Sequence, residues 1–328
     1  MFLKAVRAAR RAEGTPRPDD FSIITAPLPD PGPGEVVVAN EYLSVDPYMR
    51  EFMALGGWEL GYGLEGRAIG RVIASTVADL PEGAFVAHRH GWSTHARLTP
   101  AELRVITEYE GVPASAHLGL LGGTGLTAWV GLTRVARVRP GDDVFVSTAA
   151  GAVGGAAGQF ARLLGARRVV GSTGSPAKVG HVVGTLGFAA AFDYHDGLAE
   201  GLARVAPDGV DVYFDNVGGA HLEAAIDVLR EFGRVAWCGA IAQYATLADP
   251  PPAPRNLYDV VGKSLRLEGF LVRRNLDARP ELEDFAVPRI RSGDLVVDET
   301  VVDGFDRLPE AFLGLLRGEN TGKMLVRL

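Results

Sequence analysis

The sequence predicts an α/β protein in which one domain is rich in β-structure and the other is built on a doubly wound parallel sheet. The chain has 328 residues, which exceeds the usual size of one domain and is enough for two hydrophobic cores. In the first third, short β-segments are separated by turns rich in Pro and Gly. From about residue 119, Gly- and Ala-rich helical stretches alternate with apolar strands, which is the pattern of βαβ units in a parallel sheet.

The β-rich domain is expected to comprise residues 1–120 together with residues 300–328. Its first strands are expected at residues 35–39, 67–75, 85–88 and 93–98. After a charged helix near residues 278–291, the chain returns to short strands around a helix at residues 308–316. We therefore expect the C-terminal segment to rejoin the first domain.

The parallel-sheet domain is expected to span residues 121–299. Six strands fit a doubly wound sheet. They are expected at residues 143–147, 168–171, 190–194, 211–215, 234–238 and 265–272. The last of these strands is a plausible edge at which two copies of the chain would pair.

Composition argues against several classes of function. The formal net charge is −7 with acids and bases interspersed, so no basic stripe is present to bind nucleic acid or an anionic membrane surface. The longest apolar stretches, residues 144–150 and 156–164, fall far short of the roughly 20 residues that span a bilayer. The basic residues 1–11 are not followed by the apolar core of a signal peptide, and we therefore expect a cytoplasmic protein.

Cysteine and histidine usage predicts no metal site. Cys238 is the single cysteine, so neither an intrachain disulfide nor a cysteine cluster for zinc can form. His88, His90 and His95 have a spacing that is compatible with metal binding. No cysteine or carboxylate stands in register with them, and polar or partly buried histidines on a strand and loop are the commoner explanation.

The strongest local pattern is a strand that runs into a Gly-rich turn and then a helix. Residues 144–150 lead into Gly151, Ala152, Val153 and Gly154, with Gly158 following. Such a turn lets the backbone approach a pyrophosphate, and the helix start favours its negative charge. The spacing departs from the usual G-x-G-x-x-G, so plain packing of helix against strand is an alternative for the motif taken alone.

The end of the next strand favours NADP over NAD. A site selective for NAD carries an acidic residue there for the ribose hydroxyls, whereas residues 171–175 contain none. Ser172, Thr173 and Lys178 offer hydroxyls and a cation for a ribose phosphate. A solvated lysine at a helix start is the alternative for Lys178.

Over nearly its whole length the chain resembles the zinc-independent medium-chain dehydrogenase/reductase superfamily, in the branch of prostaglandin reductases and NADPH-dependent alkenal/one double-bond reductases. Six segments in the order of the family carry the resemblance. They are residues 43–50 (LSVDPYMR), 125–128 (GLTA), 149–158 (AAGAVGGAAG), 214–219 (FDNVGG), 238–241 (CGAI) and 318–323 (GENTGK).

The resemblance implies a GroES-like catalytic domain and a Rossmann domain, a homodimer, and NADPH bound in the cleft between the two domains. Gly151, Ala152, Val153 and Gly154 would contact the pyrophosphate, and Lys178 and Tyr194 the adenosine end. The remaining cofactor contacts would come from Thr127, Asn216, Cys238, Gly239, Ala240, Ile241, Tyr244, Phe270, Leu271, Val272 and Asn320. Tyr48, in the loop of residues 46–50, would form a wall of the substrate pocket. Half-buried core aromatics are the alternative for Tyr48 and Tyr194, and a turn cap is the alternative for Asn216.

Two positions depart from related families. Leu64 stands where zinc alcohol dehydrogenases have a His before the Glu that matches Glu65, which removes Lewis-acid alcohol chemistry. Gly262 stands where many alkenal reductases have a tyrosine. Tyr258 lies one helical turn earlier if that segment is helical, so Tyr48 and Tyr258 are the catalytic candidates.

The resulting hypothesis is hydride transfer from NADPH to the activated C=C bond of an α,β-unsaturated ketone or aldehyde. An NADPH-dependent quinone reductase is the first alternative, since it would share fold and cofactor. An NADPH-binding sensor or structural protein with little catalysis is the alternative from another class. A hydrolase is disfavoured because the sequence has no Gly-x-Ser-x-Gly motif.

Overall fold

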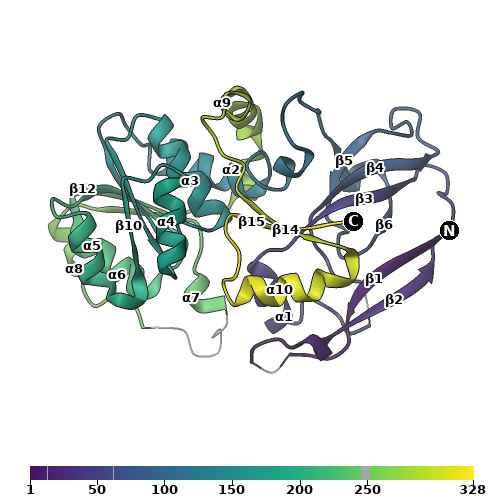
Figure 1. Cartoon of the computed structure of the whole chain (residues 1–328), viewed down its shortest axis with the longest axis horizontal. Helices are drawn as coiled ribbons and strands as arrows, with labels where there is room; N and C mark the ends of the chain where they lie inside the picture. The colour runs from purple at the N-terminus through teal and green to yellow at the C-terminus, as the bar shows by residue number, and fades with distance from the viewer. Residues whose placement is uncertain (13, 62, 245–251) are drawn as a thin grey trace. The chain divides into compact units, whose positions relative to one another are not determined.

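The chain divides into two compact units in the computed structural model, which describes residues 1–12, 14–61, 63–244 and 252–328 (Figure 1). Unit 1 comprises Met1–Leu118 and Glu299–Leu328, and unit 2 comprises Gly119–Asp298. Within the described ranges, none of the helices combines the length and the apolar character that crossing a bilayer requires.

Unit 2 is built on six parallel strands in the order β10-β9-β8-β11-β12-β13. Their bounds are β8 (Asp143–Val146), β9 (Arg168–Thr173), β10 (Ala190–Asp193), β11 (Val210–Asp215), β12 (Leu229–Trp237) and β13 (Arg266–Gly269). Counted along the chain, this is the 3-2-1-4-5-6 order of Rossmann folds. The strand order reverses between β8 and β11, and ligands of such sheets bind at the carboxyl ends of the strands at this switch point.

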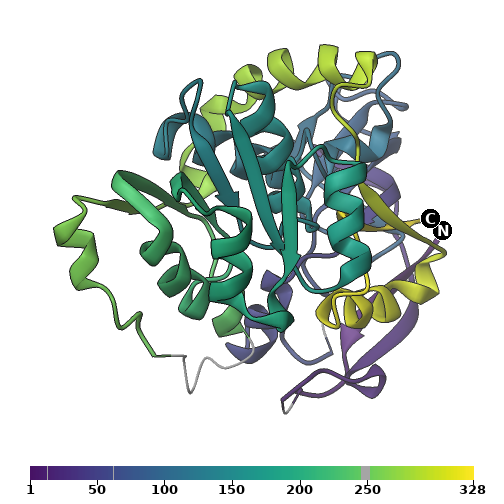
Figure 2. The same ribbon diagram turned by 60° about the vertical axis from the view of Figure 1, so that its left-hand side comes forward.

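Helices cover both faces of this sheet (Figure 2). On one side, α3 (Ala152–Leu163) packs on β8 and β9, and α4 (Pro176–Gly184) packs on β9 and β10. The remaining helices are α2 (Gly123–Val130), α5 (Leu198–Val205), α6 (Gly219–Val228), α7 (Ile241–Tyr244), α8 (Tyr258–Gly262) and α9 (Arg279–Ser292). Helix α2 packs on α3 and α9, whereas α6 packs on α5 and α8. Between sheet and helices, the rings of Phe145 and Tyr213 stack with centroids 4.8 Å apart and are fully buried.

Unit 1 contains a seven-stranded sheet of β14-β15-β3-β4-β5-β7 with β6 paired to β3, and a separate hairpin of β1 and β2. The strand bounds are β1 (Phe2–Ala8), β2 (Phe21–Pro27), β3 (Val36–Ser44), β4 (Ala68–Ser75), β5 (Phe85–His88), β6 (His95–Leu98), β7 (Leu103–Val105), β14 (Glu299–Asp303) and β15 (Lys323–Arg327). Its helices of more than one turn are α1 (Tyr48–Ala54) and α10 (Leu308–Leu316). Because β15 pairs antiparallel with β3, the last residues of the chain belong to the same sheet as the first third.

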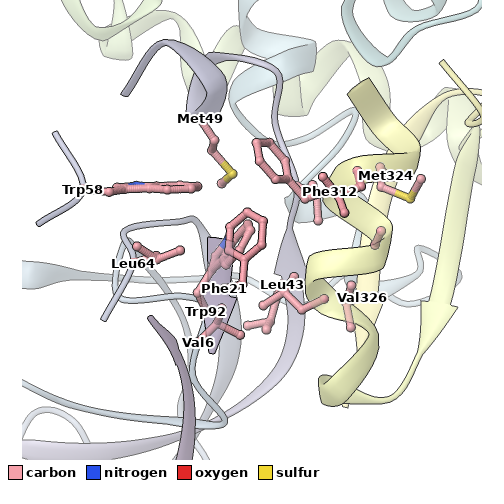
Figure 3. Packing of buried hydrophobic residues seen from close by; sticks show 14 of the residues in the cluster. Val6, Phe21, Leu43, Met49, Trp58, Leu64, Trp92, Phe312, Met324 and Val326 are labelled. Atoms are coloured by element: carbon pink, nitrogen blue, oxygen red, sulfur yellow. The ribbon is translucent and has the colours of Figure 1, made fainter. Parts of the chain in front are cut away.

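An aromatic cluster forms the core of unit 1 (Figure 3). The ring of Trp92 lies 5.1 Å from that of Trp58 and 5.6 Å from that of Phe312, and Phe21 packs on both Trp92 and Phe312. These four side chains come from the hairpin, two loops and α10. Burial of each large aromatic side chain removes about 150–250 Å² of its surface from water. The cluster therefore stabilises the packing of segments that are far apart in the sequence.

Two local expectations are corrected, and one hairpin is an addition to the expected elements. Residues 46–50 are not a loop throughout, because Pro47 has a helical φ of −61° and α1 begins at Tyr48. The strand expected at residues 265–272 ends at Gly269, because its partner Trp237 is the last residue of the neighbouring β12. The hairpin of β1 and β2 was not expected, since it precedes the turn-rich entry segment. Strand β13 is the edge of its sheet, and pairing of two copies there stays a prediction.

The three clustered histidines form hydrogen bonds within unit 1. His88 is buried, its Nε2 lies 2.8 Å from Oδ1 of Asn40, and its Nδ1 accepts the backbone N–H of His90 at 3.1 Å. A ring that accepts at Nδ1 and donates at Nε2 is neutral. Burial, followed by the charge of His90, lowers the pKa of His88 to about 4. His90 contacts Glu102 at 3.2 Å, and His95 contacts Thr94 at 2.9 Å.

The depressed pKa of His88 predicts a loss of stability in acid. In the unfolded chain its pKa is near 6.5, so below that pH the unfolded state binds a proton that the folded state rejects down to about pH 4. The free energy of unfolding should therefore fall as the pH drops from 6.5 to 4, by roughly 3 kcal/mol from this group. His221, with a pKa also lowered to about 4 by burial, adds to the same slope.

Urea unfolding at a series of pH values measures this effect. His88→Asn should flatten the slope between pH 6.5 and 4.5, and His195→Gln, at an exposed position of unit 2, is the matched control. An unchanged slope in a folded His88→Asn protein would show that His88 is not the group responsible.

Candidate functional site

The turn from β8 into α3 lies at the switch point of the unit 2 sheet. Thr148 adopts a left-handed backbone with φ +53°, and its carbonyl oxygen accepts the N–H of Gly151 at 2.9 Å. A Cβ at Gly154 would lie 2.2 Å from that same carbonyl oxygen. Only glycine therefore allows α3 to begin this close to the end of β8.

The start of α3 is suited to bind an anion. The N-cap residue Gly151 has no side chain to cap the helix, and the first turn contains no acidic residue. First-turn N–H groups lack intrahelical acceptors and carry the positive end of the helix dipole. Gly151, Ala152 and Val153 are partly exposed. The arrangement resembles the pyrophosphate sites of Rossmann folds.

The corner after β9 lies beside this turn, because Ala149 N–H donates to the carbonyl of Ser172 at 2.9 Å. The side chains of Ser172 and Thr173 lie inside the unit, and Ser172 Oγ has no hydrogen-bond partner among the residues that the structure describes. The solvent-facing part of the corner is therefore residues 174–178. Here Ser175 Oγ caps α4 by accepting the N–H of Lys178 at 3.3 Å. Partial burial lowers the pKa of the Lys178 ammonium.

Tyr194 lies at the same corner, although it is sixteen or more residues away in sequence. A Cβ at Gly174 would lie 3.4 Å from the Tyr194 ring. The ring is 40% exposed and is supported by His195, with centroids 4.1 Å apart, and edge-on by His221 at 5.2 Å. The sequence pattern gave no indication of His221, because only the fold brings the first turn of α6 to this position.

Asn216 joins the ends of three neighbouring strands. Its Nδ2 donates to the carbonyl of Ser147 at 2.7 Å, and its Oδ1 lies 3.2 Å from Sγ of Cys238. Burial, followed by the charge of Asp215, raises the pKa of the Cys238 thiol, which therefore stays protonated. The preceding residue Asp215 fixes the turn, since its Oδ1 accepts the N–H groups of Val217 and Gly218 at 2.8 Å.

The segment after β12 continues along this edge. Ile241 N–H donates to the carbonyl of Asn216 at 3.2 Å. A Cβ at Gly239 would lie 3.1 Å from that carbonyl oxygen and 3.5 Å from the hydroxyl of Tyr244. Ala240 lies between them, so the predicted residues 238–241 and Tyr244 are brought together with Asn216.

A second group gathers near α2. Thr127 is partly buried and donates its hydroxyl to the carbonyl of Gly123 at 2.7 Å. Helix α2 contacts the short 3₁₀ helix Val272–Arg274, and a Cβ at Gly131 would lie 2.9 Å from the Phe270 ring. Leu271 is exposed. Thr127, Phe270 and Val272 therefore belong to one part of unit 2.

Two predicted residues belong to unit 1. Asn320 is buried and donates from Nδ2 to the carbonyl of Gly322 at 2.8 Å. The hydroxyl of Tyr48 is buried and has no hydrogen-bond partner within the described part of the chain. Burial, followed by the charge of Asp46, raises the pKa of the Tyr48 phenol, so that it remains a hydrogen-bond donor.

The structure does not bring Tyr258 to the residues described above. Tyr258 is the first residue of α8, so its segment is helical as expected, but Tyr258 is 81% exposed. The end of this helix lies beside the amino-terminal half of β12, where Phe232 N–H donates to the carbonyl of Lys263. The cofactor candidates that follow β8, β9, β11 and β12 lie at the opposite, carboxyl ends of these strands.

The described residues contain no group of three or more His, Cys, Asp or Glu side chains arranged to hold a metal ion. Leu64 is buried in the apolar core of unit 1. The adjacent Glu65 pairs with Arg89 at 2.5 Å.

Comparisons with known proteins agree with this architecture. Residues 4–106 match the family model for the N-terminal domain of oxidoreductase, and residues 152–290 match the model for zinc-binding dehydrogenase. Prostaglandin reductase 1 of Mus musculus is 40% identical, covering 96% of this chain and 96% of its own. The 2-alkenal reductase (NADP(+)-dependent) of Nicotiana tabacum is 37% identical over 95% of this chain and 94% of its own.

A solved structure supports the same conclusion. CurA in complex with NADPH from Vibrio vulnificus is similar with a TM-score of 0.92 at 31% identity, covering 99% of this chain and 98% of that chain. The likeness confirms the predicted Rossmann and GroES-like folds. The chain belongs to the medium-chain dehydrogenase/reductase superfamily of oxidoreductases, in the branch that contains the prostaglandin and alkenal reductases.

Proposed function

We propose that this protein is an NADPH-dependent reductase that transfers hydride to the activated C=C bond of α,β-unsaturated ketones or aldehydes. The observation that carries the proposal is the uncapped, acid-free start of α3, which Gly154 allows to lie against Thr148 at the switch point of the sheet. The tobacco relative is NADP(+)-dependent by name, and the similar Vibrio structure holds NADPH.

The residues of unit 2 fit a dinucleotide with a ribose phosphate. Gly151, Ala152, Val153 and Gly154 would receive the pyrophosphate at the start of α3. Lys178 and Tyr194 both belong to the corner beyond β9, where residues 171–175 contain no acid and the carboxylate of the neighbouring Asp193 pairs with His195. Ser172 and Thr173 would support this corner from inside, because both side chains are buried.

The other proposed cofactor contacts come from two further groups of residues in unit 2. Asn216, Cys238 and the segment up to Tyr244 would hold the central part of the cofactor, and Thr127 with residues 270–272 the nicotinamide side. Asn320 would contribute from unit 1. Bound NADPH supplies the hydride, so the residues of the chain need only position the reactants and stabilise developing charge.

The substrate oxygen requires a hydrogen-bond donor. Addition of hydride to the β-carbon moves an electron pair toward the carbonyl and produces an enolate, whose α-carbon then takes a proton from solvent. We assign Tyr48 as the donor to this oxygen, because its buried hydroxyl lacks a partner among the described residues and its raised pKa keeps the proton in place. Tyr258 has no part in this assignment because its side chain is exposed.

Turnover with three substrate classes tests the proposed reaction. NADPH oxidation should be fast with an enal or an acyclic enone, slower with a quinone, and absent with saturated aldehydes. Faster turnover of the quinone would favour the quinone reductase alternative. Tight NADPH binding without turnover of any activated alkene or quinone would favour a sensor or structural role.

Replacement of Lys178 tests the cofactor preference. Lys178→Ala should weaken NADPH binding about tenfold or more while changing NADH binding less than about twofold, because only NADPH presents the added phosphate. Fluorescence titration of both dinucleotides measures this difference. The matched control is Lys4→Ala, which removes an exposed lysine that pairs with Asp306 at 2.9 Å. Equal losses for NADPH and NADH would refute the role of Lys178.

A further inference from the structure

Asp46, two residues before Tyr48 in the sequence, belongs to a buried ion pair. Lys323 and Asp46 are 2% and 3% exposed, and Nζ of Lys323 lies 3.1 Å from Oδ1 of Asp46. The same ammonium donates to the carbonyls of Val45 at 2.7 Å and Met324 at 3.2 Å. All three of its hydrogens are therefore used.

The second carboxylate oxygen of Asp46 is also occupied. Oδ2 accepts the hydroxyl of Ser44 at 2.5 Å and lies 3.6 Å from NH1 of Arg67. Burial raises the pKa of Asp46, but the charges of Lys323 and Arg67 and the hydrogen bond from Ser44 outweigh it, and the net shift is downward. Asp46 is thus an ionised anchor that connects β15, the end of β3 and the start of β4.

Arg67 links this anchor to Tyr48. Its guanidinium is held by Asp46, while its Cζ lies 5.4 Å from the centroid of the Tyr48 ring. The ring also meets Phe52 edge-on at 5.6 Å. Two contacts therefore fix the plane of the ring, yet neither occupies the buried hydroxyl, which has no partner in the described ranges. A buried hydroxyl of this kind calls for an explanation.

Several charged side chains lie around Tyr48. Glu65 pairs with Arg89 at 2.5 Å, and Asp46 pairs with Lys323. Arg67 is the cation that lies against the Tyr48 ring. A fixed positive charge near a phenol donor favours an oxygen on which negative charge develops.

From this geometry we propose that Arg67, anchored by the buried Asp46–Lys323 pair, is a positioning residue that orients Tyr48 as the donor to the carbonyl oxygen of the substrate. The inference rests on the proposed reductase function. The guanidinium acts through the phenol: it holds the ring plane by a cation–π contact and supplies positive charge behind a hydroxyl that keeps its own proton. The Asp46–Lys323 pair fixes where that guanidinium lies.

A double-mutant cycle tests the proposal. The variants are Arg67→Met, Tyr48→Phe and the double variant, with Arg67→Lys to retain a cation without the planar face. Arg71→Met is the matched control, because Arg71 lies on β4, the strand that begins directly after Arg67, but pairs with Glu41 and Glu108. The readouts are kcat and KM with one enal, the Kd of NADPH, and the Kd of the saturated product in the presence of NADP⁺.

In the otherwise native protein, Arg67→Met should lower kcat about tenfold and weaken product binding, with the Kd of NADPH unchanged. In the Tyr48→Phe background the same replacement should change kcat less than about twofold, because the group through which Arg67 acts is gone. Arg67→Lys should fall between Arg67→Met and the native protein. Arg71→Met should match the native protein in all readouts.

Multiplicative losses from the two replacements would overturn the proposal, since they would show that Arg67 acts independently of Tyr48. A parallel loss of NADPH affinity in Arg67→Met would also overturn it and indicate a general structural role. Should Arg67→Met fail to fold, Arg67→Lys in both backgrounds provides the same cycle. Failure of the native protein to reduce any enal would instead refute the proposed function.

Discussion

The close approach of α3 to the end of β8 is the constraint on which the proposed site depends. Gly154 permits it, since any Cβ would collide with the carbonyl of Thr148. The left-handed backbone of Thr148 and the hydrogen bond from Ala149 to Ser172 then fix the neighbouring corner. The same sheet brings Asn216 and Cys238 to this edge, because parallel strands present their carboxyl ends together. This packing contact and the pairing of the strands thus bring together the start of α3, the corner of residues 174–178 and the segment around Asn216 and Cys238.

The two units differ in how far their polar groups are buried. Unit 2 leaves the uncapped start of α3 at the edge of its sheet, where an anionic ligand would accept hydrogen bonds from the first-turn N–H groups. Unit 1 encloses the Asp46–Lys323 pair completely, at a cost in desolvation that an apolar pair would avoid. The four-ring cluster of Phe21, Trp58, Trp92 and Phe312 supplies the apolar burial that offsets such a cost. We infer that the role of this ion pair is to position Arg67.

Sequence patterns predicted much of the fold, and the expectations that differ from the structure do so for physical reasons. The alternation of strands and Gly-rich helices predicted the parallel sheet, and the fold class is confirmed. The end of β13 was misplaced because strand length depends on where β12 stops, which local hydrophobicity does not encode. Arg67 and His221 were missed because their contacts with Tyr48 and Tyr194 join segments distant in the chain. Tyr258 was a candidate by spacing alone, and spacing carries no information on exposure.

Direct titration of the purified protein with NADPH tests the central claim most simply, because it requires neither a substrate nor a variant. The account predicts saturable binding at one site per chain, with NADH binding more weakly and with protection of the protein against thermal unfolding. Absence of saturable binding, or equal affinity for the two dinucleotides, would contradict the assignment of the α3 start and the Lys178 corner.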